Sequence, residues 1–138
     1  MVGFYVRNMR GNDLAGLIKL NNNIDSSRFY FLSKKNKYKV IVAQLNDEIV
    51  GYVNFEILKD ITCKNTMSIN EILVDEMYRG LGIGHQLILE AEKIAKNYNV
   101  SSLIAINNSY LEEEVVFYNR QGFNLNSDRI YEKKYFDF

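Results

Sequence analysis

The chain has 138 residues and a mass of 16.1 kDa, which suits one domain, residues 1–138, with a single buried core. Hydrophobic residues make up 47% and charged residues 25%, values that exclude a disordered or collagen-like chain. The 17 Lys and Arg residues balance 17 Asp and Glu residues, so the net charge favours neither a nucleic acid nor a membrane as partner. The single cysteine, Cys63, and the lack of a secretory signal in residues 1–11 predict a cytoplasmic protein.

The first half of the chain predicts strands on either side of a helical segment. Apolar residues alternate over 4–9, which predicts a strand, and they recur at helical spacing over 14–20, which predicts a short helix. The aromatic run within residues 26–35 is consistent with a second helix. Residues 38–45 and 49–58, joined by turn residues, predict a β-hairpin.

The second half predicts strands and helices in alternation. The expected elements are a strand at 68–74, a helix at 83–98, a strand at 100–106, a helix between Ser109 and Gly122, and strands over 123–138. This order predicts the α/β (α+β) class, with a mixed sheet and helices on both of its faces.

A glycine-rich segment, Arg79-Gly80-Leu81-Gly82-Ile83-Gly84, follows the predicted strand and opens the next helix. Glycines let the backbone turn its N–H groups towards a phosphate, and the helix dipole favours the anion. Arg79 adds a fixed positive charge. The spacing differs from the dinucleotide-binding Gly-x-Gly-x-x-Gly and lacks the Gly-Lys-Ser/Thr of nucleotide triphosphate loops. We therefore expect a pyrophosphate-binding loop of another kind.

Two motifs in this region resemble those of the GNAT superfamily of N-acetyltransferases. Arg79-x-x-Gly82-x-Gly84 fits the coenzyme A signature Gln/Arg-x-x-Gly-x-Gly/Ala, and residues 117–123 resemble Phe-Tyr-x-x-x-Gly-Phe. The resemblance is strong over residues 68–123. It implies a mixed, mostly antiparallel central sheet of 6–7 strands with helices on both faces. It also implies that the strand ending at Val74 splays away from the strand at 100–106.

The resemblance implies acetyl-CoA as cofactor. Its pantetheine arm is expected on the backbone of Ile72, Leu73 and Val74. Its pyrophosphate is expected on the N–H groups of Arg79, Gly80, Leu81, Gly82, Ile83, Gly84 and His85. The family asparagine that contacts the cofactor arm falls on Leu111 here. Either Asn107 or Asn108 replaces it, or the contact is absent.

Two residues are expected to carry the catalysis. Tyr118 occupies the position of the family's general acid, and a phenol with a pKa near ~10 can protonate a departing thiolate. The alternative role for Tyr118 is a packed aromatic side chain. Glu71 lies on the strand beside the expected thioester and could accept the amine's proton, although a solvated strand residue is the alternative.

The expected activity is transfer of an acetyl group from acetyl-CoA to a primary amine of a small molecule or peptide by direct attack. The alternative is a non-catalytic acyl-CoA-binding regulatory module. The single histidine leaves little support for Ser-His-Asp catalysis, and no His/Cys cluster suggests a metal. The C-terminal strand over 131–138 could pair with a second copy in a homodimer.

Overall fold

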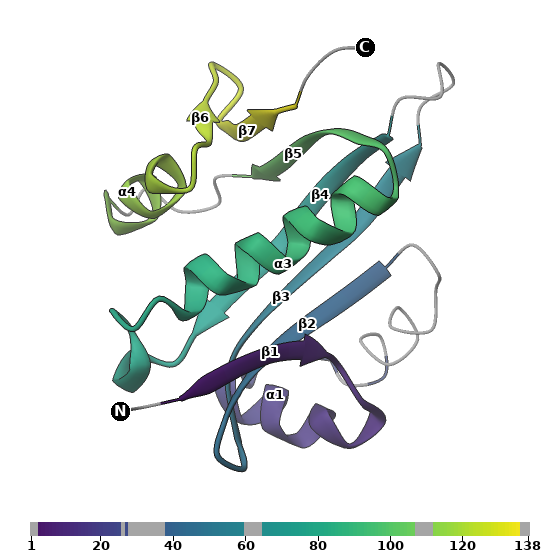
Figure 1. Cartoon of the computed structure of the whole chain (residues 1–138). Helices are drawn as coiled ribbons and strands as arrows, with labels where there is room; N and C mark the ends of the chain where they lie inside the picture. Colours follow the sequence, from purple (N-terminus) through teal and green to yellow (C-terminus); the bar gives the residue numbers. More distant parts are fainter. Residues whose placement is uncertain (1–2, 26, 28–37, 60–64, 107–111, 136–138) are drawn as a thin grey trace.

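The computed structural model describes residues 3–25, 27, 38–59, 65–106 and 112–135 (Figure 1). In chain order the elements are β1 Phe4–Asn8, η1 Gly11–Asp13, α1 Leu14–Leu20, β2 Tyr38–Leu45, β3 Glu48–Lys59, β4 Asn65–Val74, η2 Glu76–Tyr78, α3 Ile83–Asn97, β5 Val100–Ile106, α4 Glu112–Arg120, β6 Asn124–Leu125 and β7 Ile130–Lys134. The helix predicted over 26–35 and the residues Cys63, Asn107, Asn108, Ser109 and Leu111 lie outside the described residues, apart from residue 27.

The strands form one sheet in the order β1-β2-β3-β4-β5-β7-β6. The β4–β5 pair is parallel and the other pairs are antiparallel. Leu17 of α1 is buried against Val42 and Tyr52 on one face, whereas Leu87 and Ile88 of α3 are buried on the other face (Figure 1). The predicted class, a mixed and mostly antiparallel sheet with helices on both faces, is confirmed.

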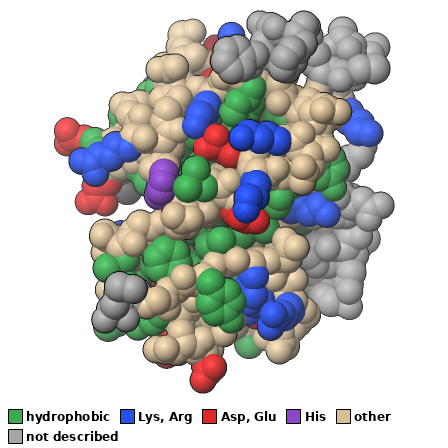
Figure 2. All heavy atoms as spheres, viewed as in Figure 1, with side chains coloured by type: hydrophobic (Ala, Val, Ile, Leu, Met, Phe, Trp, Pro, Cys, Tyr) green, Lys and Arg blue, Asp and Glu red, His purple; other side chains and the backbone are tan. Residues whose placement is uncertain are grey.

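The surface carries both signs of charge. Figure 2 shows Lys and Arg side chains interspersed with Asp and Glu on the visible face, as a zero net charge leads one to expect. Within the described part of the chain, no helix combines the length and the apolar character that crossing a membrane requires.

Two predicted strands differ from the structure. β4 begins at Asn65, three residues before the predicted start, because β3 extends to Lys59 and pairs with its polar end. The C-terminal region forms β6 and β7, and Tyr131 of β7 pairs with Ala105 on one side and Leu125 on the other. The strand predicted to pair with a second copy of the chain is therefore already paired on both sides at Tyr131.

An extra residue in β4 lies where the described pairing with β5 ends. Asn54 of β3 pairs with Glu71, but the next residue, Phe55, pairs with Ile69, so Asn70 is a bulge without a partner on β3. β4 pairs with β5 over residues 65–69. Beyond the bulge, no described residue of β5 pairs with β4, which agrees with the expected splay.

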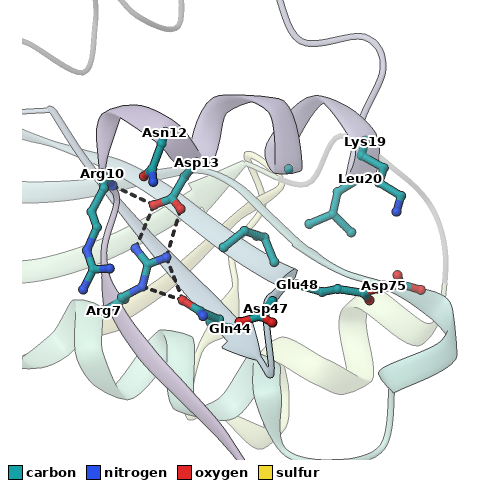
Figure 3. Close-up of a pocket in the computed structure, with 12 residues that line it drawn as sticks. Arg7, Arg10, Asn12, Asp13, Lys19, Leu20, Gln44, Asp47, Glu48 and Asp75 are labelled. Carbon is teal, nitrogen blue, oxygen red and sulfur yellow. Dashed lines mark hydrogen bonds and ion pairs between the residues drawn. The ribbon is translucent and has the colours of Figure 1, made fainter.

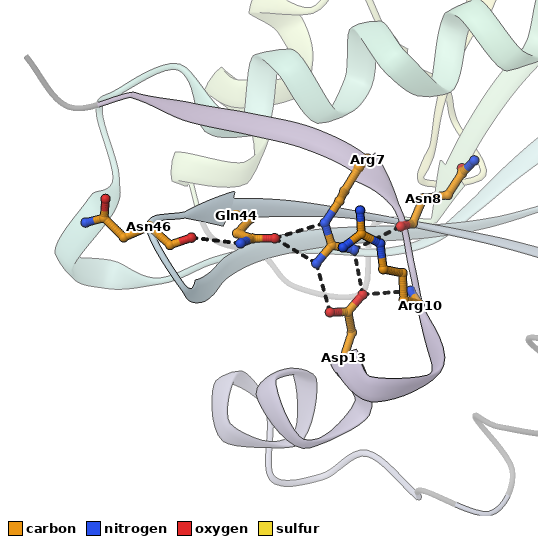
Figure 4. Close-up of polar contacts among 6 residues, drawn as sticks. All are labelled: Arg7, Asn8, Arg10, Asp13, Gln44 and Asn46. Atoms are coloured by element: carbon orange, nitrogen blue, oxygen red, sulfur yellow. Dashed lines mark hydrogen bonds and ion pairs between the residues drawn. The ribbon is translucent and has the colours of Figure 1, made fainter.

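A partly buried ion pair joins the segment before α1 to the sheet (Figure 4). Arg7 of β1 donates to both carboxylate oxygens of Asp13 at 2.7 and 2.9 Å and to Gln44 Oε1 of β2. The backbone N–H of Arg10 also donates to Asp13. The Arg7 guanidinium, followed by this N–H, holds the pKa of Asp13 below its usual value. The network thereby positions the start of α1 against β1 and β2.

Replacing Asp13 by Asn should lower the free energy of unfolding by about 2 kcal/mol at neutral pH, because it removes charged hydrogen bonds. The pKa of Asp13 is lowered in the folded state, so its contribution is present above the ordinary value of about 3.9 and is lost as the pH falls through the folded value. The difference in the free energy of unfolding between wild type and Asp13→Asn, measured by urea unfolding, should be smaller at about pH 2 than at about pH 7. The exposed Asp47→Asn is the control; an unchanged difference at low pH would contradict the assignment.

Candidate active site

A groove of about 1150 Å³ runs along the edge of β4 that β5 leaves open. It is bounded by β4, the loop after η2, the start of α3, and α4. The predicted site residues that line it are Glu71, Ile72, Leu73, Val74, Arg79, Gly80, Gly82, Ile83, Gly84, His85 and Tyr118. Leu81 does not line the groove, and its side chain is exposed. Asn107 and Asn108 lie outside the described residues.

The open edge of β4 offers backbone hydrogen-bonding groups to a ligand. Ile72 and Leu73 pair with Val53 and Tyr52 of β3 on one side, while no described strand pairs with them on the other. Backbone N–H and C=O groups at a strand edge can pair with amides of an extended ligand. This arrangement fits the pantetheine arm, which contains two amides.

The loop between η2 and α3 presents N–H groups to an anion. Gly80 and Gly82 have φ values of 82° and 84°, a conformation that favours glycine. Gly82 caps α3 without a side-chain hydrogen bond, and the first bond of the helix runs from Gln86 N to Gly82 O at 3.0 Å. The N–H groups of residues 83–85 therefore lack partners within the helix and can receive a pyrophosphate.

Arg79 is held beside this loop by the end of β4. Its Nε donates to the carbonyl oxygen of Val74 at 3.2 Å. A guanidinium has five N–H donors, so the four on its terminal nitrogens stay available for an anion. The structure thus gives the predicted cation a fixed position at the junction of strand and loop.

Gly84 is required for a different reason from Gly80 and Gly82. A Cβ atom at Gly84 would lie 2.9 Å from Cε1 of Phe117, whereas at Gly80 or Gly82 it would meet nothing within 4 Å. His85 Nδ1 lies 2.6 Å from Oε1 of Gln121. The first contact joins α3 to α4, and the second joins α3 to the turn after α4. The sequence motif did not reveal that its last glycine positions the helix that carries Tyr118.

Tyr118 is buried at the groove with 4% of its surface exposed. Its ring stacks on Tyr131 with centroids 4.3 Å apart and meets Phe117 and Phe123 edge-on at 5.3 Å. Burial, and then the negative charge of Glu114, raise the pKa of Tyr118. The phenol therefore keeps its proton at neutral pH, as a proton donor must.

Glu71 lies on the opposite face of β4 from Tyr118. The hydroxyl of Tyr52 donates to its Oε1, and Asn21 Nδ2 donates to its Oε2 at 3.1 Å. Glu71 is half-buried, so it is not the freely solvated residue that was the alternative. Sequence reasoning missed Tyr52 and Asn21, because neither belongs to a motif and they lie 19 and 50 residues from Glu71.

A second hollow of about 430 Å³ lies beside α1 and the β2–β3 turn (Figure 3). Its lining includes Arg7 and Asp13, whose charged groups already bind each other, together with Lys19, Asp47 and Glu48. Of the predicted site residues that the structure describes, none lines this hollow. All of them except Leu81 line the groove along β4.

Solved structures share this fold at low sequence identity. The PaiA N-acetyltransferase from Thermoplasma acidophilum, in complex with coenzyme A, is 20% identical with a TM-score of 0.82 over 96% of this chain and 99% of that chain. Naa50 of Arabidopsis thaliana, in complex with the bisubstrate analogue CoA-Ac-MVNAL, is 20% identical with a TM-score of 0.79 over 97% and 100%. An aminoglycoside acetyltransferase from an uncultured soil metagenomic sample, in complex with sisomicin, is 21% identical with a TM-score of 0.74 over 86% of each chain.

No curated protein sequence matches the chain. The family model described as "Acetyltransferase (GNAT) family" matches residues 18–123, which is more than half of the chain and includes the groove-lining residues above. The chain therefore belongs to the GNAT acetyltransferase family and is an acyl-CoA-dependent acetyltransferase whose cofactor is acetyl-CoA.

Proposed function

We propose that the chain acetylates a primary amine of a small molecule or peptide by direct attack within the groove along β4. The observation that carries this proposal is the placement of Glu71 and Tyr118 on opposite faces of the open β4 edge, within one groove. One side chain can accept a proton and the other can donate one. A direct transfer needs both groups near the same thioester.

The residues that would hold acetyl-CoA fit its parts. The open backbone of Ile72, Leu73 and Val74 suits the pantetheine amides, and the N–H groups of residues 83–85 with Arg79 suit the pyrophosphate. The positive φ at Gly82 favours glycine, which has no side chain to obstruct the anion. When bound, acetyl-CoA supplies the activated acetyl group.

The chain's own residues then handle the protons. An ammonium ion has no lone pair, so the acceptor must lose a proton, and Glu71 receives it directly or through one water molecule. A backbone N–H on the open edge of β4 polarises the carbonyl. Tyr118 donates its phenolic proton to the departing sulfur, and its raised pKa keeps that proton in place until then.

Two of the similar solved structures support an amine acceptor that is either a small molecule or a peptide. The ligand of Naa50 contains the peptide sequence MVNAL, and the metagenomic enzyme binds sisomicin, an aminoglycoside. Sisomicin carries amino groups, and the peptide MVNAL is joined to coenzyme A through an acetyl group. A non-catalytic acyl-CoA-binding module would not need Glu71 and Tyr118 in the groove, so their presence there supports catalysis by this chain.

Cofactor binding should depend on the loop. Calorimetric titration of coenzyme A into Arg79→Ala should show affinity reduced by roughly 10- to 100-fold, the value of charged hydrogen bonds to phosphate. Gly82→Glu should abolish binding, because it adds strain and a like charge at the anion site. Lys93→Ala is the control, because it removes an exposed positive charge from α3, the helix that follows the loop. It should bind coenzyme A as wild type does. Wild type that fails to bind would refute the proposal.

Turnover should depend on the hydroxyl of Tyr118. In a thiol-release assay with primary amines, Tyr118→Phe should lower kcat by about 100-fold, because a general acid is lost. The dissociation constant of the Tyr118→Phe variant for coenzyme A should equal that of wild type. Tyr131→Phe is the matched control: this stacked tyrosine has a buried hydroxyl without a hydrogen-bond partner, so its loss should leave kcat unaffected. Equal kcat values for Tyr118→Phe and wild type would assign Tyr118 a packing role.

A further inference from the structure

Three residues from three parts of the fold converge beside the groove, and one of them, Glu71, lines it. Asn21 caps the C-terminal end of α1, Tyr52 lies in β3 and Glu71 lies in β4. The Tyr52 hydroxyl donates to Glu71 Oε1, and Asn21 Nδ2 donates to Glu71 Oε2 at 3.1 Å and to the Tyr52 oxygen at 3.2 Å. Both oxygens of one carboxylate therefore have their own donor.

The two donors are themselves held in place. Asn21 N donates to Leu17 O at 2.9 Å, and its Oδ1 accepts from Asn23 N at 3.1 Å, so its amide cannot rotate without losing bonds. Tyr52 is fully buried among residues of the α1 face. With both donors fixed, the plane of the Glu71 carboxylate is fixed too, and each oxygen keeps a lone pair for another donor.

The bulge at Asn70 is what brings Glu71 to these donors. Met67 and Ile69 pack on the α3 face, so strict alternation would turn Glu71 to that face as well. The extra residue reverses the alternation. Glu71 then shares a face with Tyr52, while Ile72 packs on the α3 face.

The two donors are directed at Glu71 and not at its buried neighbour Asn54. Asn54 is paired with Glu71 across the strands and is only 5% exposed, yet its Oδ1 has no hydrogen-bond partner in the described structure. A network that served stability alone would be expected to satisfy its buried members. Here two donors converge on Glu71, a partly exposed carboxylate that lines the groove.

We propose that Tyr52 and Asn21 are positioning residues, which hold the Glu71 carboxylate in the orientation that receives the proton of the acceptor amine. This inference rests on the proposed function. In the step, an N–H bond of the acceptor breaks, an O–H bond forms on Glu71, and the electron pair left on nitrogen attacks the acetyl carbonyl. Tyr52 donates its hydrogen bond throughout and does not give up its proton, since burial and the neighbouring Glu71 raise the pKa of Tyr52.

The test is a double-mutant cycle measured as steady-state acetylation of an alkyl diamine, an aminoglycoside and a peptide with a free N-terminus. Tyr52→Phe should lower kcat/KM for the accepted amine by roughly 10- to 100-fold, with the KM for acetyl-CoA unchanged. Asn21→Asp keeps the shape of the side chain but replaces its N–H donor by a carboxylate, whose negative charge repels that of Glu71. It should lower kcat/KM at least as much as Tyr52→Phe does. In the Glu71→Gln background, Tyr52→Phe should cause no further loss, because it acts through Glu71.

Tyr135→Phe is the matched control, because it removes a tyrosine–glutamate hydrogen bond of the same kind, to Glu92 at 2.9 Å, away from the groove. It should leave kcat/KM unchanged. If Glu71→Gln is impaired but Tyr52→Phe and Asn21→Asp are not, or if the losses add in the double variant, the positioning role is wrong and the proposed function stands. If Glu71→Gln keeps full activity, or wild type acetylates none of the amines, the proposed function itself fails and this inference with it.

Discussion

The extra residue in β4 is the constraint on which the site depends. A sheet with uninterrupted pairing would satisfy the backbone of residues 72–74 from both sides and leave no edge for a ligand. The bulge at Asn70 coincides with the end of β4–β5 pairing at Ile69, and it also turns Glu71 to the α1 face. One local irregularity thus lies where the open backbone edge begins and sets the face on which the acidic side chain lies.

The anion-binding loop is coupled to the rest of the site through α3. Its N–H groups come from the start of that helix, and the helix packs on the same core as the sheet. Gly84 lets Phe117 of α4 approach closely, and α4 carries Tyr118 into the groove. The loop that suits the pyrophosphate and the phenol that suits the sulfur are therefore connected through the packing of α3 against α4.

The parts of the site that depend on neighbouring residues in the sequence were predictable. Arg79, Gly82 and Gly84 form a local motif, and the family it indicated is confirmed. The roles of Tyr118 and Glu71 stay predictions. Tyr52 and Asn21 could not be found, because their approach to Glu71 depends on strand pairing and on a bulge that periodicity does not reveal. The true start of β4 was missed for a similar reason, since its polar end is stabilised by pairing with β3.

A crystal structure of the protein with a bisubstrate analogue, in which coenzyme A is joined to an amine through the acetyl group, would test the account most directly. The account predicts pantetheine amides paired with the backbone of residues 72–74 and the pyrophosphate on the N–H groups of residues 83–85. The acetyl group would lie between Glu71 and Tyr118. A ligand bound in the hollow beside α1, or a pantetheine arm that does not touch β4, would contradict it.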